Sequence, residues 1–286
     1  MYISLTTTPK RIQNIELNIL SLKKQTIPPT KILLWVPHLY KGKKEYSIPD
    51  FLLSDPMVEI IRCKDVGPAT KFIHTIDYLG ANKDFIIVDD DTIYSQYLIE
   101  DLTALPNLYG AKCVKGTAFE DWNGKAVKSR DPDYPNRQRK SIRVIGENNE
   151  PDSLYNIKLR MVPIVCGCDG ILVNTSFFNS KIYNIQKDFF NCDDIWLSGY
   201  LAINKIEKIV VPCREISRTK SEFQQLPFDL LNGGTITKCK KTNNIKYKRG
   251  QMPHVRYLST YGCLDGGKYE TINNYEKVIR YFNEQT

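Results

Sequence analysis

The sequence lacks the cysteine spacing that structural zinc sites use. It has eight cysteines in 286 residues, but no two of them form a Cys-x-x-Cys pair, and Cys166 and Cys168 flank a single glycine. This spacing argues against a structural zinc module. At this cysteine density we expect reduced, mostly buried thiols, with disulfide bonds as the alternative if the protein is exported.

Long apolar runs are also absent. No stretch approaches 18 apolar residues, so we expect no membrane-spanning helix. The N-terminal sequence MYISLTTTPKRI has no basic segment followed by an apolar one, as a secretory signal would have. We therefore expect a cytoplasmic protein, or a domain that belongs to a longer chain.

The charge imbalance is too small to indicate nucleic acid binding. The net charge of +8 suits an anionic partner but does not by itself predict a nucleic acid. A basic block, KCKKTNNIKYKRG, occupies residues 238–250. It is either a solvated loop or a flap that contacts phosphates or an anionic acceptor.

Apolar segments alternate with helical patterns through the first 115 residues. We expect strands at residues 2–5, 31–36, 58–62, 84–88 and 111–115, with helices at residues 11–24, 69–79 and 95–105. This alternation favours a parallel, doubly wound α/β sheet with right-handed crossovers. The chain length suits one large domain of this class.

The pattern changes at about residue 116. Residues 116–160 are polar, turn-rich and charged, which is typical of a functional or disordered loop. Beyond them we expect strands at residues 161–165, 171–173 and 206–211, and helices at residues 194–203 and 271–282.

Three aspartates directly follow the strand expected at residues 84–88, in the segment DFIIVDDDTIYS. Crowded carboxylates repel one another, and burial raises the cost of their charge, so a positive partner is expected. A solvated acidic turn is one interpretation. The apolar strand before the turn favours the other, a metal site at the carboxyl end of a strand. Asp89 and Asp91 offer the hard oxygen ligands that Mg²⁺ or Mn²⁺ prefers.

A second pair of acids, Asp193 and Asp194, stands where a helix is expected to begin. Such residues often cap a helix N-terminus. A carboxylate with a pKa raised by burial can also act as a general base. The pair could serve both purposes.

Five segments together resemble glycosyltransferases of the GT-A fold, in a family-2-like branch. FIIVDDDTIY is similar to the Asp-x-Asp segment, SLTTTPKRI to the first strand and nucleotide loop, and KDVGPATKF to a D-x-G-P-x-T-K stretch. CGCDGILV resembles an acceptor-side strand, and CDDIWLSGYLA the helix with an acidic pair. Their order and spacing fit over residues 1 to about 211.

The resemblance implies a Rossmann-like α/β fold, with a mostly parallel central sheet flanked by helices in a single domain with a C-terminal extension. It divides the chain into a donor-binding half at residues 1–115, an acceptor-side and catalytic half at residues 116–211, and an extension or flap at residues 212–286. It also implies the transfer of a sugar from a nucleotide-diphosphate donor, by resemblance a UDP-sugar, to a glycan or other hydroxyl acceptor, with inversion. Neither nucleic acid nor a membrane span is expected.

The resemblance also implies roles for individual residues. Metal ligands would be Asp89, Asp91 and His254, holding Mn²⁺ or Mg²⁺; Asp89 could contact the ribose instead, and so could Asp90. Donor contacts would come from Thr6, Thr8, Arg11, Asp65, Lys71 and Asp90. Asp194 corresponds to the general base, but Asp193 replaces a more usual glutamate, so either acid is a candidate.

Three residues carry alternative interpretations. For His254 an ordinary loop or core histidine is the favoured interpretation. Trp122 and Trp196 could stack on sugar rings, although the expected helix face favours core packing for Trp196.

Two other functions compete with this one. VDDDTI approximates the nucleophile motif of haloacid-dehalogenase-like, Mg²⁺-dependent phosphohydrolases, in which Asp89 would be a phosphoaspartyl nucleophile. The motif does not follow the first strand, however, and its fifth position is Ile93. The other alternative is a non-catalytic module that binds a nucleotide sugar.

Overall fold

A computed structural model describes residues 1–105, 110–114, 117–118, 140–141, 160–161, 164–165, 167, 170–211 and 270–285. Its strands are β1 (Tyr2–Thr6), β2 (Lys31–Pro37), β3 (Val58–Cys63), β4 (Asp84–Ile87), β5 (Ala111–Val114), β6 (Thr117–Ala118), β7 (Lys140–Ser141), β8 (Arg160–Met161), β9 (Ile171–Asn174) and β10 (Lys208–Val211). Its α-helices are α1 (Glu16–Lys23), α2 (Asp50–Leu53), α3 (Thr70–Leu79), α4 (Leu98–Thr103), α5 (Asp193–Ile203) and α10 (Glu270–Glu284).

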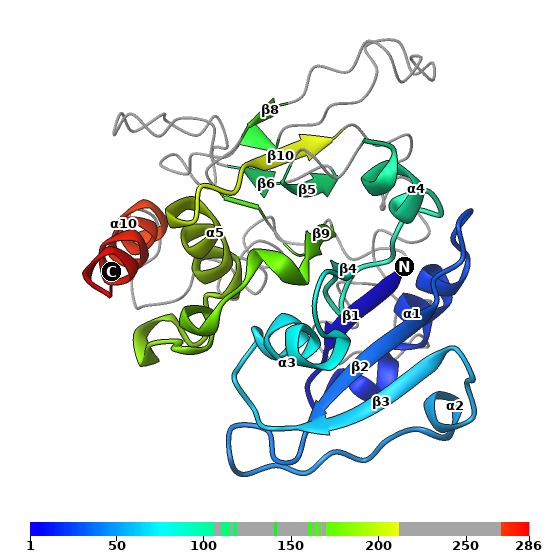
Figure 1. The fold of residues 1–286 in the computed structure, drawn as a ribbon. Helices are drawn as coiled ribbons and strands as arrows, with labels where there is room; N and C mark the ends of the chain where they lie inside the picture. Colours follow the sequence, from blue (N-terminus) through cyan, green and yellow to red (C-terminus); the bar gives the residue numbers. More distant parts are fainter. Residues whose placement is uncertain are drawn as a thin grey trace, which may run out of the picture.

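One sheet, in the strand order β3-β2-β1-β4-β9-β5-β10-β8, organises the fold (Figure 1). Strands β3, β2, β1 and β4 are parallel to one another, and β10 is parallel to β5. Strand β9 is antiparallel to both β4 and β5, and β8 is antiparallel to β10. The predicted mostly parallel α/β sheet is confirmed. Two of its strands, β8 and β9, run against the others.

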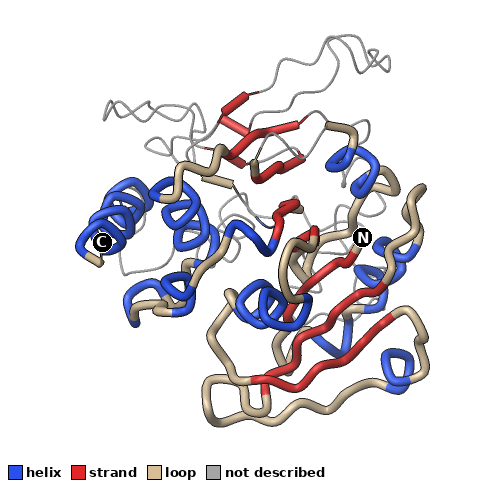
Figure 2. Tube along the Cα trace, in the orientation of Figure 1, coloured by secondary structure: helices blue, strands red, loops and turns tan. Residues whose placement is uncertain are grey.

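Helices cover both faces of this sheet (Figure 2). Ile3 and Leu5 of β1 pack in the cluster that contains residues of α1 and α4, whereas Phe85 and Ile87 of β4 pack with residues of α3 and α5. Ile86, between them, is also fully buried. A strand buried on both faces needs an unbroken apolar run, which explains why FIIV predicts β4 so clearly.

Three expected elements differ from the observed ones. The helix expected at residues 11–24 is a short 3₁₀ turn, Ile12–Asn14, followed by α1. Helix α4 begins only at Leu98, because the hydroxyl of Ser95 accepts a hydrogen bond from the Tyr97 amide (3.2 Å) and forms a turn. Among the described residues, the strand expected at residues 161–165 is observed only as β8, Arg160–Met161. Val165 lies outside a strand, and its amide donates to Ser198 Oγ of α5 (3.0 Å).

The C-terminal helix α10 packs directly on α5, and the two lie side by side in Figure 1. Trp196 of α5 is fully buried, with its ring centroid 4.5 Å from that of Phe282, and its indole nitrogen donates to the Ile182 carbonyl (2.9 Å). Gly199 allows the close approach, since a Cβ there would lie 2.3 Å from Val278 Cγ1. The core interpretation of Trp196 is confirmed, as is a helix near residues 271–282.

We expect Trp196→Ala to lower the free energy of unfolding by about 3–5 kcal/mol, because it leaves a cavity between α5 and α10. Chemical denaturation followed by circular dichroism measures the change. Leu53→Ala is the control: Leu53 is 63% exposed, so its loss should change stability by less than about 0.5 kcal/mol. Equal effects from the two substitutions would contradict this packing.

Several expectations fall outside the described residues: His254, Trp122, the basic block at residues 238–250 and most of residues 116–160. The division into 1–115, 116–211 and 212–286 therefore stays a prediction. Within the described ranges, none of the helices has both the length and the apolar character needed to span a bilayer.

Candidate active site

The candidate site lies at the carboxyl ends of two neighbouring parallel strands. Thr6 ends β1, and Asp89 follows β4, which pairs with β1 in register Ser4↔Ile87. The chain turns from β1 toward β2 on one side and places β4 on the other. Such a reversal point in an α/β sheet is where ligands usually bind.

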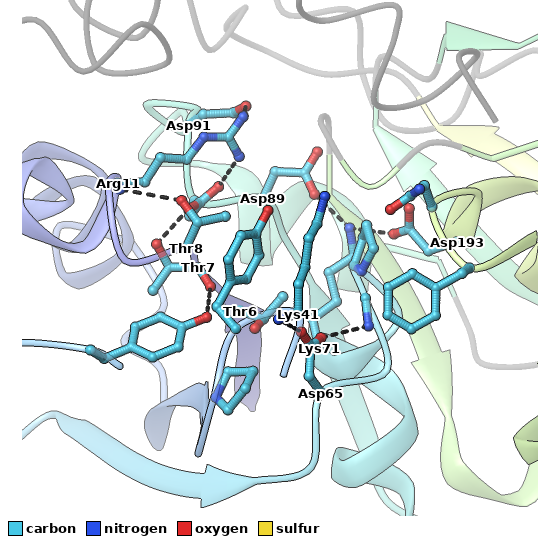
Figure 3. Close-up of a pocket in the computed structure, with 18 of the residues that line it drawn as sticks. Thr6, Thr7, Thr8, Arg11, Lys41, Asp65, Lys71, Asp89, Asp91 and Asp193 are labelled. Carbon is cyan, nitrogen blue, oxygen red and sulfur yellow. Dashed lines mark hydrogen bonds and ion pairs between the residues drawn. The ribbon is translucent and has the colours of Figure 1, made fainter. Parts of the chain in front are cut away.

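A cavity of about 480 Å³ opens at this point (Figure 3). Its lining residues come from the loops after β1, β2, β3 and β4, from the first turn of α3, and from the start of α5 and the residues just before it. They are Thr6, Thr7, Thr8, Arg11, Pro37, Tyr40, Lys41, Tyr46, Asp65, Gly67, Pro68, Lys71, Asp89, Asp90, Asp91, Phe190, Asn191, Asp193 and Asp194. All the described site residues predicted from the sequence are therefore brought together in one cavity.

Arg11 provides the positive partner of the acidic triplet. Its guanidinium lies 2.8 Å from Asp90 Oδ1 and 3.2 Å from Asp91 Oδ2, and Thr7 donates its hydroxyl to Asp90 Oδ2 (2.6 Å). Burial raises the pKa of Asp90, and Arg11 opposes that rise. Asp90 and Asp91 are both almost fully buried, so a solvated acidic turn does not describe this segment.

Lys71 joins the acidic triplet to the second pair of acids. Its ammonium lies 2.5 Å from Asp89 Oδ1 and 2.7 Å from Asp193 Oδ2, between the two in Figure 3. Burial opposes the charge of Lys71, but Asp193 and Asp89 outweigh it and raise the pKa of the ammonium well above its ordinary value. This side chain links residues that are far apart in the sequence.

Asp193 and Asp194 form the first turn of α5, yet neither caps the helix with its side chain. The N-cap residue is Cys192, which makes no side-chain capping bond. Asp194 Oδ1 accepts a hydrogen bond from the Gly167 amide (2.9 Å). Burial, and then the charge of Asp193, raise the pKa of Asp194 well above its ordinary value. The interpretation that this pair only caps the helix is therefore wrong.

The other residues predicted to contact the sugar donor, Asp65, Thr6 and Thr8, also line the cavity, and hydrogen bonds to nearby groups hold each of them in place. Asp65 accepts from the Lys41 amide (2.6 Å) and the Gly67 amide (2.8 Å), and so ties two loops together. Thr6 donates its hydroxyl to the Trp35 carbonyl (2.9 Å). Thr8 Oγ1 accepts from the Arg11 amide (3.3 Å) and helps to fix the start of the next helical turn.

Sequence reasoning missed several residues of this site. Thr7 stands between two threonines that were predicted, so only the pairing with Asp90 distinguishes it. Tyr94 accepts from the Asp89 amide (2.8 Å) and donates to the Gly167 carbonyl (3.3 Å). Phe190 packs over Gly67, where a Cβ would lie 2.3 Å from the Phe190 carbonyl oxygen. Tyr94 ends the segment FIIVDDDTIY, but its hydrogen bonds are not predictable from that segment, and no sequence motif indicates Phe190.

The carboxylate oxygens of Asp89, Asp90 and Asp91 are the kind of ligand that a hard divalent cation prefers. In the part of the chain that the structure describes, however, no three His, Cys, Asp or Glu side chains gather in a way that could hold a metal ion. His254, the third ligand that was expected, lies outside those residues. Two carboxylates completed by substrate phosphates are a common way to bind Mg²⁺, so Asp89 and Asp91 fit such an ion.

The cysteine next to the acidic pair differs from expectation. Cys192 is disulfide-bonded. Cys63 is a buried free thiol, and burial raises its pKa to about 12. The expectation of reduced thiols therefore holds for Cys63 and not for Cys192.

Comparison with known proteins finds limited similarity. No family model and no curated protein matches the chain. Among solved structures, one described as a glucose-1-phosphate thymidylyltransferase from Bacillus anthracis, in complex with a sucrose, aligns at a TM-score of 0.40 with 16% identity, over 73% of this chain and 85% of the other. An inositol-1-phosphate CTP transferase from T. maritima aligns at 0.40 with 12% identity, over 82% and 96%. The bifunctional IspDF from Campylobacter jejuni aligns at 0.38 with 12% identity, over 76% and 45%. Similarity at these TM-scores and identities indicates no function for this chain.

Proposed function

We propose that this protein is a metal-dependent glycosyltransferase, which moves a sugar from a nucleotide-diphosphate donor to an acceptor hydroxyl with inversion. One observation carries the proposal. The acidic triplet at the end of β4 and the acidic pair at the start of α5 face the same cavity and are joined through Lys71. Inverting sugar transfer needs both kinds of group: one set to hold the departing diphosphate and one to activate the hydroxyl.

The donor would lie along the loops after β1, β3 and β4. Thr6, Thr8 and Asp65 line the part of the cavity that we assign to the nucleoside, and uridine is our preferred base. Arg11 and Lys71 are the basic groups beside the acidic triplet, so the diphosphate is assigned to them. Asp90 is held by both Thr7 and Arg11, and we assign it to the ribose.

Asp89 and Asp91 would hold the divalent cation, Mn²⁺ or Mg²⁺. When bound, such a cation supplies positive charge that stabilises the departing diphosphate. The protein's own contribution is to keep the carboxylates of Asp89 and Asp91 at the carboxyl ends of β1 and β4. The backbone of Asp89 is fixed by two hydrogen bonds. Its amide donates to the Tyr94 hydroxyl, and its carbonyl oxygen accepts from the side-chain amide of Asn18 (2.9 Å).

Asp194 is the better candidate for the general base. Asp193 is already neutralised by the ammonium of Lys71 at 2.7 Å. Within the described part of the chain, Asp194 makes no ion pair of this kind; it accepts a hydrogen bond from the Gly167 amide, and burial raises its pKa. A raised pKa brings a carboxylate nearer to the value at which it can remove a proton from a hydroxyl group. Asp193 and Lys71 would then position Asp194.

A panel of nucleotide sugars tests the proposal. The protein is mixed with each donor, with Mn²⁺ or with a chelator, and followed by thermal shift and by release of nucleoside diphosphate. We expect one donor to raise the melting temperature only when Mn²⁺ is present, because a ligand stabilises the state that binds it, and to be slowly hydrolysed. Phosphate release from a phosphomonoester, with no response to any nucleotide sugar, would instead support a phosphohydrolase.

A further inference from the structure

The ammonium of Lys71 is shared between acids from two distant segments. Its Nζ lies 2.5 Å from Asp89 Oδ1 and 2.7 Å from Asp193 Oδ2, and its side chain is only 5% exposed. Removing either partner from such a buried pair is costly, unless another charge takes the place of the partner that leaves.

Arg11 has the corresponding position on the other side of the triplet. Its guanidinium contacts Asp91 Oδ2 at 3.2 Å as well as Asp90 Oδ1 at 2.8 Å. Both aspartates assigned to the metal, Asp89 and Asp91, are thus already paired with a cation of the protein. Among the described residues that line the cavity, six are aspartates and three are basic, and this excess of acidic groups favours further positive charge.

We infer that Lys71 and Arg11 are exchangeable counter-ions of the metal-binding aspartates; this inference rests on the proposed function. In the free protein they neutralise Asp89 and Asp91. Once these carboxylates bind a divalent cation, the nearby ammonium and guanidinium groups are repelled by it. A diphosphate offers both groups a new anionic partner, and the flexible stem of a lysine allows the move.

This exchange has a thermodynamic consequence. Lys71 competes with the metal in the free protein but contributes to binding of the diphosphate. The metal and the diphosphate must therefore strengthen each other's binding by the same factor. Removing the ammonium should tighten binding of the metal alone and weaken binding of the diphosphate. A lysine that only supports the fold would not produce effects of opposite sign.

Isothermal titration calorimetry on the full chain tests this with Mn²⁺ and uridine diphosphate as probes. In the wild type, we expect saturating uridine diphosphate to tighten Mn²⁺ binding by about tenfold or more. In Lys71→Met, Mn²⁺ alone should bind more tightly than in the wild type, and uridine diphosphate should bind more weakly. The linkage, which is the factor by which uridine diphosphate tightens Mn²⁺ binding, should be smaller. The matched control is Lys23→Met, which removes a lysine paired with Asp55 outside the cavity and should leave all three values unchanged.

Two results would overturn the inference alone: both probes bind the wild type without linkage, or Lys71→Met shifts both affinities in the same direction. If the wild type bound neither probe, the proposed function would fail, and the inference with it. The wild-type linkage requires no variant, so it remains decisive even if Lys71→Met does not fold.

Discussion

Replacement of Asp194 by asparagine is expected to lower the rate of sugar transfer by about 100- to 10,000-fold, while donor affinity stays close to that of the wild type. The amide oxygen of asparagine can still accept the hydrogen bond from Gly167, so the loop geometry should persist. What is lost is the ability to take a proton from the acceptor. Nucleoside diphosphate release in the presence of acceptor measures the rate, and calorimetry measures donor binding.

The same variant tests the raised pKa of Asp194. A base acts in its deprotonated form, so the wild-type rate should rise as pH increases through a pKa well above the ordinary 3.8. The residual rate of Asp194→Asn should lack this rise. Stability should show the opposite sign. A carboxyl with a raised folded-state pKa stabilises the fold at low pH, and that contribution is lost as pH rises through the folded pKa.

The decisive comparison is with Asp193→Asn. This substitution removes a partner of Lys71 rather than the proposed base, so it should alter the rate less than Asp194→Asn does. The pH-dependent rise of the rate should remain but move to lower pH, because the charge of Asp193 helps to raise the pKa of Asp194. If Asp194→Asn turned over normally while Asp193→Asn lost activity and the pH-dependent rise, the roles of the two acids would be exchanged.

Replacement of Asp91 by alanine should abolish metal-dependent donor binding, with a loss of affinity of more than about 100-fold. Substituting even a residue that only supports a metal ligand commonly costs 10- to 100-fold, and Asp91 is proposed as a ligand itself. The fold should survive, because Arg11 keeps its bond to Asp90 at 2.8 Å. Titration of the preferred donor, with Mn²⁺ and with chelator, measures the effect.

Asp55→Ala is the matched control for that experiment. Asp55 precedes β3, at the opposite end of the strands, and pairs with Lys23 (2.6 Å). Losing this partly exposed surface pair should cost at most about 1 kcal/mol of stability and leave donor binding unchanged. If Asp91→Ala bound donor and metal as well as Asp55→Ala does, Asp91 would not be a metal ligand.

Much of the fold is predictable from local patterns. The apolar runs at residues 31–36 and 84–88 predict β2 and β4 to within a residue, because strands buried on both faces need unbroken apolar side chains. The placement of the triplet after β4 follows in the same way. The pattern could not show that β9 runs antiparallel between β4 and β5, because a short apolar run has the same composition in either direction.

The sequence by itself determined which side chains are available to this site and where in the chain they stand: threonines and an arginine at and after the end of β1, three aspartates after β4, and two more in the first turn of α5. Only the tertiary structure decided how their charges are paired. Lys71 neutralises Asp193 and leaves Asp194 with the amide of Gly167, although the two acids are adjacent in the chain. The physical reason is that a pKa depends on burial and on charges a few ångströms away, and folding brings those charges from distant segments.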